Sequence, residues 1–189
     1  VDIKDALADD SVDIVSIATP NNWHTLAAIW AMQAGKDVYV EKPLTHDLSE
    51  GAAAVQAQNQ YQRIVQVGTQ QRSMPQFQKA YEILKSGQLG DIHKVHLTWN
   101  RNTPRWARTN YGIDPTTVDW KRFLGTAPEQ PFDEYRFRNW RWFWDFGGGI
   151  FTDLMVHQID IAHWFLDLDH PATAASIGDM FKAQGLWET

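Results

Sequence analysis

Residues 12–40, VDIVSIATPNNWHTLAAIWAMQAGKDVYV, decide the fold class of this chain. The first seven are mostly apolar and rich in β-branched residues, which is typical of a strand buried on both faces. Residues 23–34 have helical composition, and Gly35 stands where such a helix would end. Residues 38–40 form a second short apolar run. This order predicts two parallel strands joined by a helix.

The flanking segments extend the same pattern. Residues 3–8 are typical of the end of a helix, and residues 49–61 predict an Ala- and Gln-rich helix. Residues 64–67 predict a third strand, which Gly68 closes. The β-α-β-α-β order predicts an α/β fold with a parallel sheet and right-handed crossovers.

The pattern changes after Gly68. Residues 75–85 predict a helix, and residues 94–99 alternate as a strand with one solvated face would. Residues 100–146 are irregular, with four prolines and many aromatic residues, which suits a substrate loop or a subunit contact. Three glycines, 147–149, then precede a predicted helix at residues 150–166.

Composition excludes several classes of function. The net charge is −6 and there is no run of Lys or Arg, which disfavours a nucleic-acid surface. No stretch approaches the ~20 apolar residues that a membrane helix needs. The chain has no cysteine, which excludes disulfides and thiolate metal sites.

Polar residues follow all three predicted strands. Because ligands bind beyond the carboxyl ends of parallel strands, we expect these residues to form a ligand site at one edge of the sheet. They are Thr19, Pro20, Asn21, Asn22 and His24 after the first strand, Glu41, Lys42 and Pro43 after the second, and Gly68, Gln70, Gln71 and Arg72 after the third.

The helix at residues 150–166 carries a row of ionisable side chains. Asp153, His157 and Asp160 are spaced to share one helical face. A metal site through His163 is disfavoured, because His163 diverges from His157 by about 120° around a helix. Asp153 and His157 could instead pair with neighbours in the core. Upstream, Trp140, Trp142 and Trp144 could form an amphipathic binding wall or a structural cluster.

Two segments together resemble a known family. Residues 12–51 contain a Glu41-Lys42-Pro43 motif, and residues 147–164, GGGIFTDLMVHQIDIAHW, contain G-G-x-x-x-D-x-x-x-H. Both closely resemble the Gfo/Idh/MocA family of NAD(P)-dependent oxidoreductases. The resemblance implies the C-terminal half of a Rossmann-type parallel sheet in residues 1–72. Part of an α+β substrate and oligomerisation domain would follow in residues 73–189.

The resemblance also implies roles for individual residues. Lys42 would lie near the nicotinamide and the reacting oxygen, and His157 would transfer the proton while Asp153 faces the substrate. In many members the bond between this Lys and Pro is cis. The implied catalytic residues are Lys42, Asp153 and His157; the implied cofactor-binding residues are Thr19, Pro20, Asn21, His24, Glu41, Lys42, Pro43, Gln70 and Arg72.

The implied activity is hydride transfer between NAD or NADP and a secondary alcohol of a sugar, inositol or related polyol. Two alternatives stay open: a glycosidase that uses NAD for transient oxidation, and a non-catalytic binding protein that retains the fold. We expect the intact parent chain to form a homo-oligomer. Relatives include both cytoplasmic and exported proteins, so localisation stays open.

The sequence departs from the family in one respect. It contains no G-x-G-x-x-G, the loop that cradles the cofactor pyrophosphate. We therefore expect an internal fragment that lacks this N-terminal region and the C-terminal part of the second domain. A natural short form is the alternative. On the fragment interpretation, the 189-residue chain alone should bind NAD poorly and be inactive.

Overall fold

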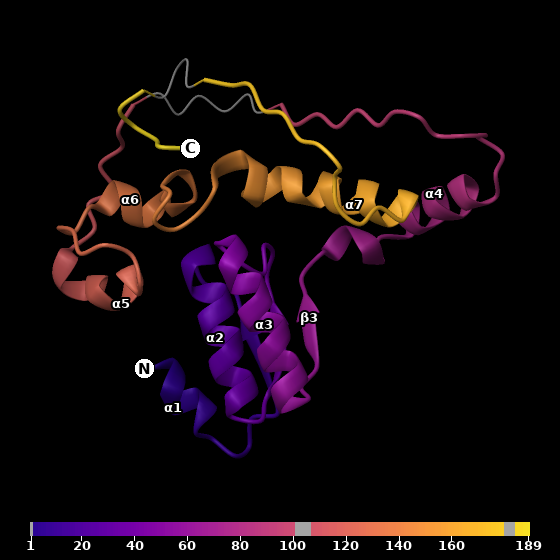
Figure 1. Cartoon of the computed structure of the whole chain (residues 1–189). Helices are drawn as coiled ribbons and strands as arrows, with labels where there is room; N and C mark the ends of the chain where they lie inside the picture. Colours follow the sequence, from indigo (N-terminus) through magenta and orange to yellow (C-terminus); the bar gives the residue numbers. More distant parts are fainter. Residues whose placement is uncertain (1, 101–106, 180–183) are drawn as a thin grey trace.

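A parallel sheet forms the first part of the chain. The computed structural model describes residues 2–100, 107–179 and 184–189 (Figure 1). The first elements are α1 (Ile3–Leu7), β1 (Ile14–Ile17), α2 (Asn21–Gln33), β2 (Asp37–Val40), α3 (Leu48–Tyr61) and β3 (Val65–Val67). The strands are parallel in the order β1-β2-β3. The predicted α/β fold is therefore confirmed.

One face of the sheet packs on α2 and α3. Ala27, Ala28 and Ala31 of α2 are completely buried, because their small side chains let the helix lie close to the strands. Val38 and Val40 of β2 point into the same core. Burial of this apolar face is the main force that holds the two helices on the sheet.

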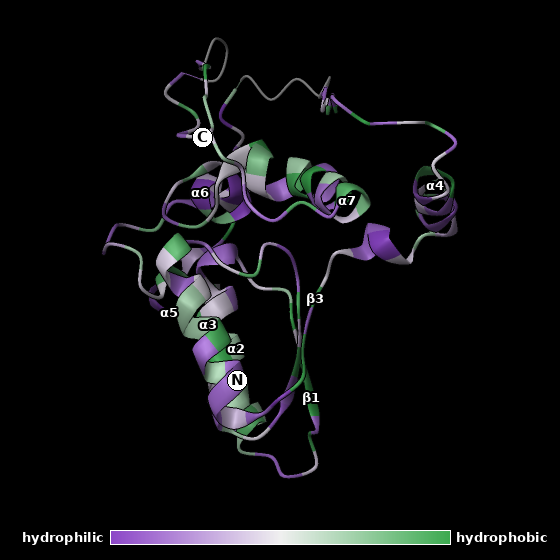
Figure 2. Ribbon diagram, turned by 45° about the vertical axis from the view of Figure 1, so that its right-hand side comes forward, coloured by the Kyte–Doolittle hydropathy of each residue, from purple (hydrophilic) through white to green (hydrophobic). Residues whose placement is uncertain are grey.

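The other face of the sheet is open, and here the prediction of a first strand buried on both faces is wrong. Ile14 of β1 is 65% exposed and Tyr39 of β2 is 37% exposed. Figure 2 shows α2 and α3 together on one side of the strands, with no described element against the other. Apolar, β-branched composition indicates a strand, but it does not say what covers each face.

The segment after the sheet begins as expected. A 3₁₀ turn, η1 (Gln70–Ser73), leads into α4 (Pro75–Lys85), which has the predicted bounds. The strand predicted at residues 94–99 does not form in the structure. Val95 is 45% exposed, and none of the described segments pairs with this stretch. Alternation fits a strand, yet a strand also needs a hydrogen-bonding neighbour.

A second core lies within the stretch predicted to be irregular. Of that stretch, residues 101–106 lie outside the described residues. The rest contains η2 (Pro115–Thr117), α5 (Trp120–Leu124), α6 (Glu134–Arg138) and η3 (Trp140–Trp142). The buried residues of this core are Leu124, Tyr135, Trp142, Phe143 and Phe146. Trp142 stacks on Trp187 with ring centres 4.8 Å apart, so it has a structural role, whereas Trp144 is 61% exposed.

The last helical segment has two parts. It begins with a π-helical turn, η4 (Phe151–Met155), and continues as α7 (Val156–Leu166). Tyr81 of α4 stacks on Trp164 of α7 with ring centres 4.9 Å apart. None of the helices in the described ranges is long and apolar enough to cross a membrane.

Replacing Phe146 by Ala is expected to lower the free energy of unfolding by about 3–5 kcal/mol, the usual cost of removing a buried aromatic ring. Phe146 has no exposed surface and contacts the rings of Trp120 and Phe123. Urea unfolding measures the change. Trp144→Ala, at an exposed position of the same segment, is the control and should change stability little. Equal losses in the two variants would show that Phe146 is not part of a stabilising core.

Candidate active site

The three strands end level with one another at one edge of the sheet. Ile17 lies opposite Val40, and Val40 lies opposite Val67. The ladder continues one residue further, since the Glu41 amide donates to the Ile17 carbonyl at 2.9 Å. Thr19, Glu41 and the residues after Gly68 therefore follow the same edge, as the sequence predicted.

Glycine at position 68 leaves room for the Glu41 side chain. A Cβ at this position would lie 3.1 Å from Glu41 Oε1 and 3.1 Å from the Tyr39 hydroxyl. None of the described residues hydrogen bonds to the Glu41 carboxylate, which leaves it available to a ligand at the edge of the sheet.

His24 connects two turns of this edge. Its Nδ1 lies 2.6 Å from the Pro43 carbonyl, and its Nε2 lies 2.8 Å from the Thr19 carbonyl. The ring is 1% exposed, and the peptide between Lys42 and Pro43 is cis. Because both ring nitrogens contact backbone oxygens, His24 holds together the turns that carry Thr19 and Pro43.

Lys42 joins the strand edge to the π-helical turn η4. Its Nζ donates to the Asp153 carbonyl oxygen and lies 3.3 Å from Asp153 Oδ1. Both side chains are mostly buried, at 14% and 15% exposure. Arg141 of η3 donates from Nε to the same Oδ1 at 3.0 Å. Lys42 and Asp153, which are more than 100 positions apart in the sequence, are thus in contact. Arg141 contacts the same carboxylate, and the sequence analysis did not identify it as a site residue.

His157 lies one turn beyond Asp153, at the start of α7. Its side chain is buried, and neither ring nitrogen hydrogen bonds to another described residue. Burial lowers the pKa of His157, and the nearby Lys42 ammonium lowers that pKa further, against smaller opposing effects of Asp153, Glu41 and Asp160. The imidazole is therefore neutral at neutral pH and can accept a proton.

Arg72 is paired within the protein. Its Nε and Nη2 donate to the two carboxylate oxygens of Asp160 at 2.8 and 2.7 Å, and its guanidinium lies 5.7 Å from the Trp164 ring centre. The family resemblance implies that Arg72 and Gln70 contact a cofactor. In this structure the Arg72 fork links η1 to α7, while Gln70 is exposed.

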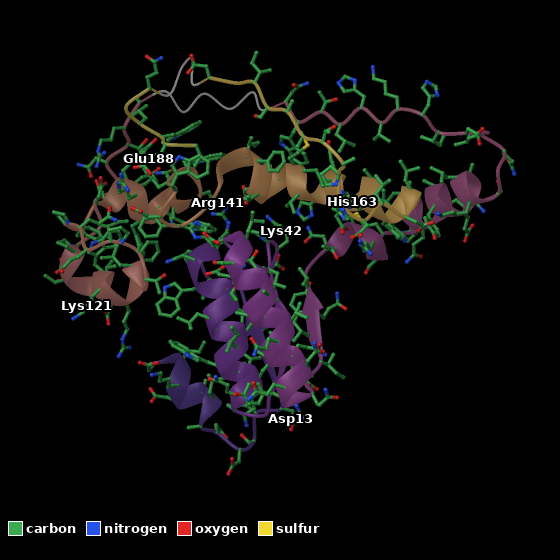
Figure 3. The ribbon with its side chains drawn as sticks, viewed as in Figure 1. Asp13, Lys42, Lys121, Arg141, His163 and Glu188 are labelled. Carbon is green, nitrogen blue, oxygen red and sulfur yellow. The ribbon has the colours of Figure 1, made fainter. Side chains whose placement is uncertain are left out.

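A cleft of about 590 Å³ separates the strand edge from α7. Figure 3 labels Lys42 at the top of the sheet and His163 on the helix above it. Within the described ranges, no three His, Asp or Glu side chains are grouped as metal ligands. The cleft is lined by Lys42, Pro43, Leu44, Val67, Thr69, Arg72, Val156, Ile159, Asp160, His163, Trp164, Asp167 and Leu168.

Comparison with known families agrees with this arrangement. Residues 1–69 match a family model described as an oxidoreductase family with an NAD-binding Rossmann fold, and residues 77–186 match the GFO/IDH/MocA C-terminal domain. The chain belongs to the Gfo/Idh/MocA family. The Gfo/Idh/MocA motifs recognised in the sequence, at residues 41–43 and 148–157, lie in these two matched regions.

Several curated relatives are oxidoreductases. Oxidoreductase P35 of Formosa agariphila is 29% identical over 167 residues, which are 87% of this chain and 44% of that protein. The scyllo-inositol 2-dehydrogenase (NAD(+)) of Bacillus subtilis is 28% identical over 166 residues, 87% of this chain and 38% of that enzyme. The chain therefore spans less than half the length of these relatives.

Solved structures share the fold. The WlbA dehydrogenase from Bordetella pertussis, solved with NADH and UDP-GlcNAcA, matches with a TM-score of 0.62 and 24% identity over 87% of this chain and 43% of that one. The myo-inositol 2-dehydrogenase from Lactobacillus plantarum matches with a TM-score of 0.56 and 24% identity, over 87% and 40% of the two chains. At this level of identity the likeness concerns the fold.

Proposed function

We propose that the full protein carrying this chain transfers a hydride between NAD and a secondary alcohol of a sugar, inositol or related polyol. The observation that carries the proposal is the contact of Lys42 with Asp153, with His157 one turn away, beside the cleft at the sheet edge. Inositol dehydrogenases among the relatives support this substrate class.

The residues at the sheet edge fit the nicotinamide end of NAD. Leu44, Val67, Val156 and Ile159 give the cleft apolar surface suited to a planar ring, and the free Glu41 carboxylate can accept hydrogen bonds from ribose hydroxyls. When bound, the nicotinamide supplies the hydride acceptor. We assign the other contacts to Thr19, Pro20, Asn21, Pro43, Gln70 and Arg72, with His24 acting through the backbone.

Lys42 would stabilise negative charge on the substrate oxygen. An ammonium group that is mostly shielded from water interacts strongly with a developing oxyanion. Asp153 would hold Lys42 in place, because its backbone carbonyl accepts a hydrogen bond from the Lys42 ammonium and its carboxylate forms an ion pair with the same group. This fixes the ammonium before substrate arrives, which is the condition for electrostatic catalysis.

His157 would accept the proton that leaves the alcohol. Its lowered pKa keeps the ring neutral at neutral pH, and burial shields the proton transfer from water. We also propose that residues 1–72 act as the cofactor part and residues 73–189 as the substrate part, which the ranges of the two family matches support.

The test is an assay of the full-length protein with NAD and a panel of inositols, aldoses and alkyl glycosides. We expect reduced nicotinamide to accumulate in equal amounts to an oxidised polyol or sugar. Cleavage of a glycoside without net cofactor reduction would instead identify a glycosidase. A protein that binds sugar without turnover, and still does so after Lys42→Ala, would be a binding protein.

A further inference from the structure

Arg141 is held firmly beside the proposed catalytic residues. Its guanidinium lies 4.3 Å from the ring centre of Trp140, and its Nε is bonded to Asp153. Figure 3 labels Arg141 beside Lys42, above the sheet. The side chain is 44% exposed, and its terminal amino groups make no hydrogen bond or ion pair with a described residue. The terminal amino groups of the Arg141 guanidinium are therefore free to bind a ligand.

The backbone of Arg141 is fixed by close packing. A Cβ on Gly147 would lie 3.1 Å from both Arg141 Cα and the Arg141 carbonyl oxygen, so a side chain at position 147 would press against the Arg141 backbone. The two following residues, Trp142 and Phe143, are 4% exposed and belong to the second core. A rigid core thus positions an exposed cation, which favours a binding role over an incidental surface charge.

The charges around Arg141 do not cancel. A single carboxylate oxygen, Asp153 Oδ1, lies 3.0 Å from Arg141 Nε and 3.3 Å from Lys42 Nζ. The nearby Asp160 carboxylate already uses both oxygens to bind Arg72. The Asp153 carboxylate can neutralise only one of these two cations, and the Glu41 carboxylate, which is assigned to the ribose, makes no hydrogen bond or ion pair with Arg141.

We propose that Arg141 is a specificity-determining residue that binds a carboxylate carried by the substrate, so that the preferred substrate is a sugar acid such as a uronic acid. A guanidinium fork matches the planar carboxylate and can donate two parallel hydrogen bonds to it. A neutral polyol would offer only hydroxyl groups to the same fork. The inference rests on the proposed function and narrows its substrate class.

The test compares glucose with glucuronate, and galactose with galacturonate, as substrates of the full-length protein. We expect kcat/KM to be at least about tenfold higher for each uronate, the discrimination given by one charge-assisted hydrogen bond. Arg141→Gln should lower the ratio of kcat/KM for the uronates to kcat/KM for the neutral sugars by about tenfold or more. Arg141→Lys should recover part of the preference.

Arg138→Gln is the matched control, because it removes the same charge from α6, where the Arg138 side chain is exposed and lies over the Tyr111 ring. It should leave the uronate preference unchanged. Equal loss of activity toward uronates and neutral sugars in Arg141→Gln would overturn the proposal, as would a wild-type preference for neutral sugars. Preference for glucose 6-phosphate over glucuronate would overturn the carboxylate assignment.

Calorimetric titration of glucuronate in the presence of NAD separates this inference from the proposed function. Glucuronate binding that is lost in Arg141→Gln but not in Arg138→Gln supports the Arg141 site, even where no sugar is oxidised. Oxidation of neutral and acidic sugars with equal efficiency supports the proposed function and overturns the Arg141 site.

Discussion

Lys42→Met is expected to lower kcat by about 10³-fold, because removal of a preorganised donor at a developing oxyanion typically costs 10²–10³ and loss of general acid–base support adds to it. Methionine approximates the length of the lysine stem without its charge. Asp153 keeps its hydrogen bond to Arg141 in the variant, so no carboxylate is left buried and unpaired. We therefore expect the fold to survive and the loss to be catalytic.

The measurement is steady-state turnover of the full-length protein with the best substrate from the panel, alongside thermal unfolding. Lys79→Met is the matched control: Lys79 lies on α4, is 72% exposed and, among the residues that the structure describes, pairs only with Glu82. Its kcat should stay within about threefold, since exposed ion pairs contribute little. Turnover of Lys42→Met at the level of Lys79→Met would show that Lys42 has no catalytic role.

The edge of the sheet at which the three strands end could be predicted from the sequence, because the patterns that indicate it are local. Short runs rich in β-branched residues, followed by Pro20, Pro43 and Gly68 and separated by helical segments, leave one consistent topology. That topology alone brings Thr19, Glu41 and Gly68 to one edge. The contact between Lys42 and Asp153 could not be predicted in this way. The two residues are 111 positions apart, and no local sequence pattern indicates that they are close in space.

Other features depended on packing that composition does not encode. The strand predicted at residues 94–99 has the right alternation, but no strand of the described structure lies beside it. The helix predicted at residues 150–166 begins as a π-helix, which changes the spacing around Asp153. Arg141 lies in an aperiodic stretch; its one sequence signal was the Trp140-Arg141 pair shortly before three glycines, of which Gly147 lets the two segments touch.

His157→Asn is expected to lower kcat by about 10²–10⁴-fold, the usual contribution of a general base. Asparagine keeps the size and polarity of the side chain but cannot accept the proton at neutral pH. In the wild type, alcohol oxidation should slow as the pH falls through the pKa of His157, which burial and Lys42 hold below its ordinary value. The pH profile of kcat should lose this acidic limb in His157→Asn. An unchanged limb would assign the proton acceptor to another group.

The same pKa can be read without turnover, by NMR titration of the His157 ring. Lys42→Met should raise the pKa of His157, because the ammonium that opposes protonation is gone while burial still acts.

The lowered pKa of His157 also makes the stability of the protein depend on pH. A His whose pKa is lowered on folding binds fewer protons in the native state than in the unfolded state, so wild-type stability should fall as the pH drops from the unfolded value of about 6.5 through the folded pKa. Lys42→Met should reduce that loss. An unchanged pKa of His157 in Lys42→Met would show that the Lys42 ammonium does not act on the imidazole. The proposal that Lys42 helps to keep His157 neutral would then be wrong.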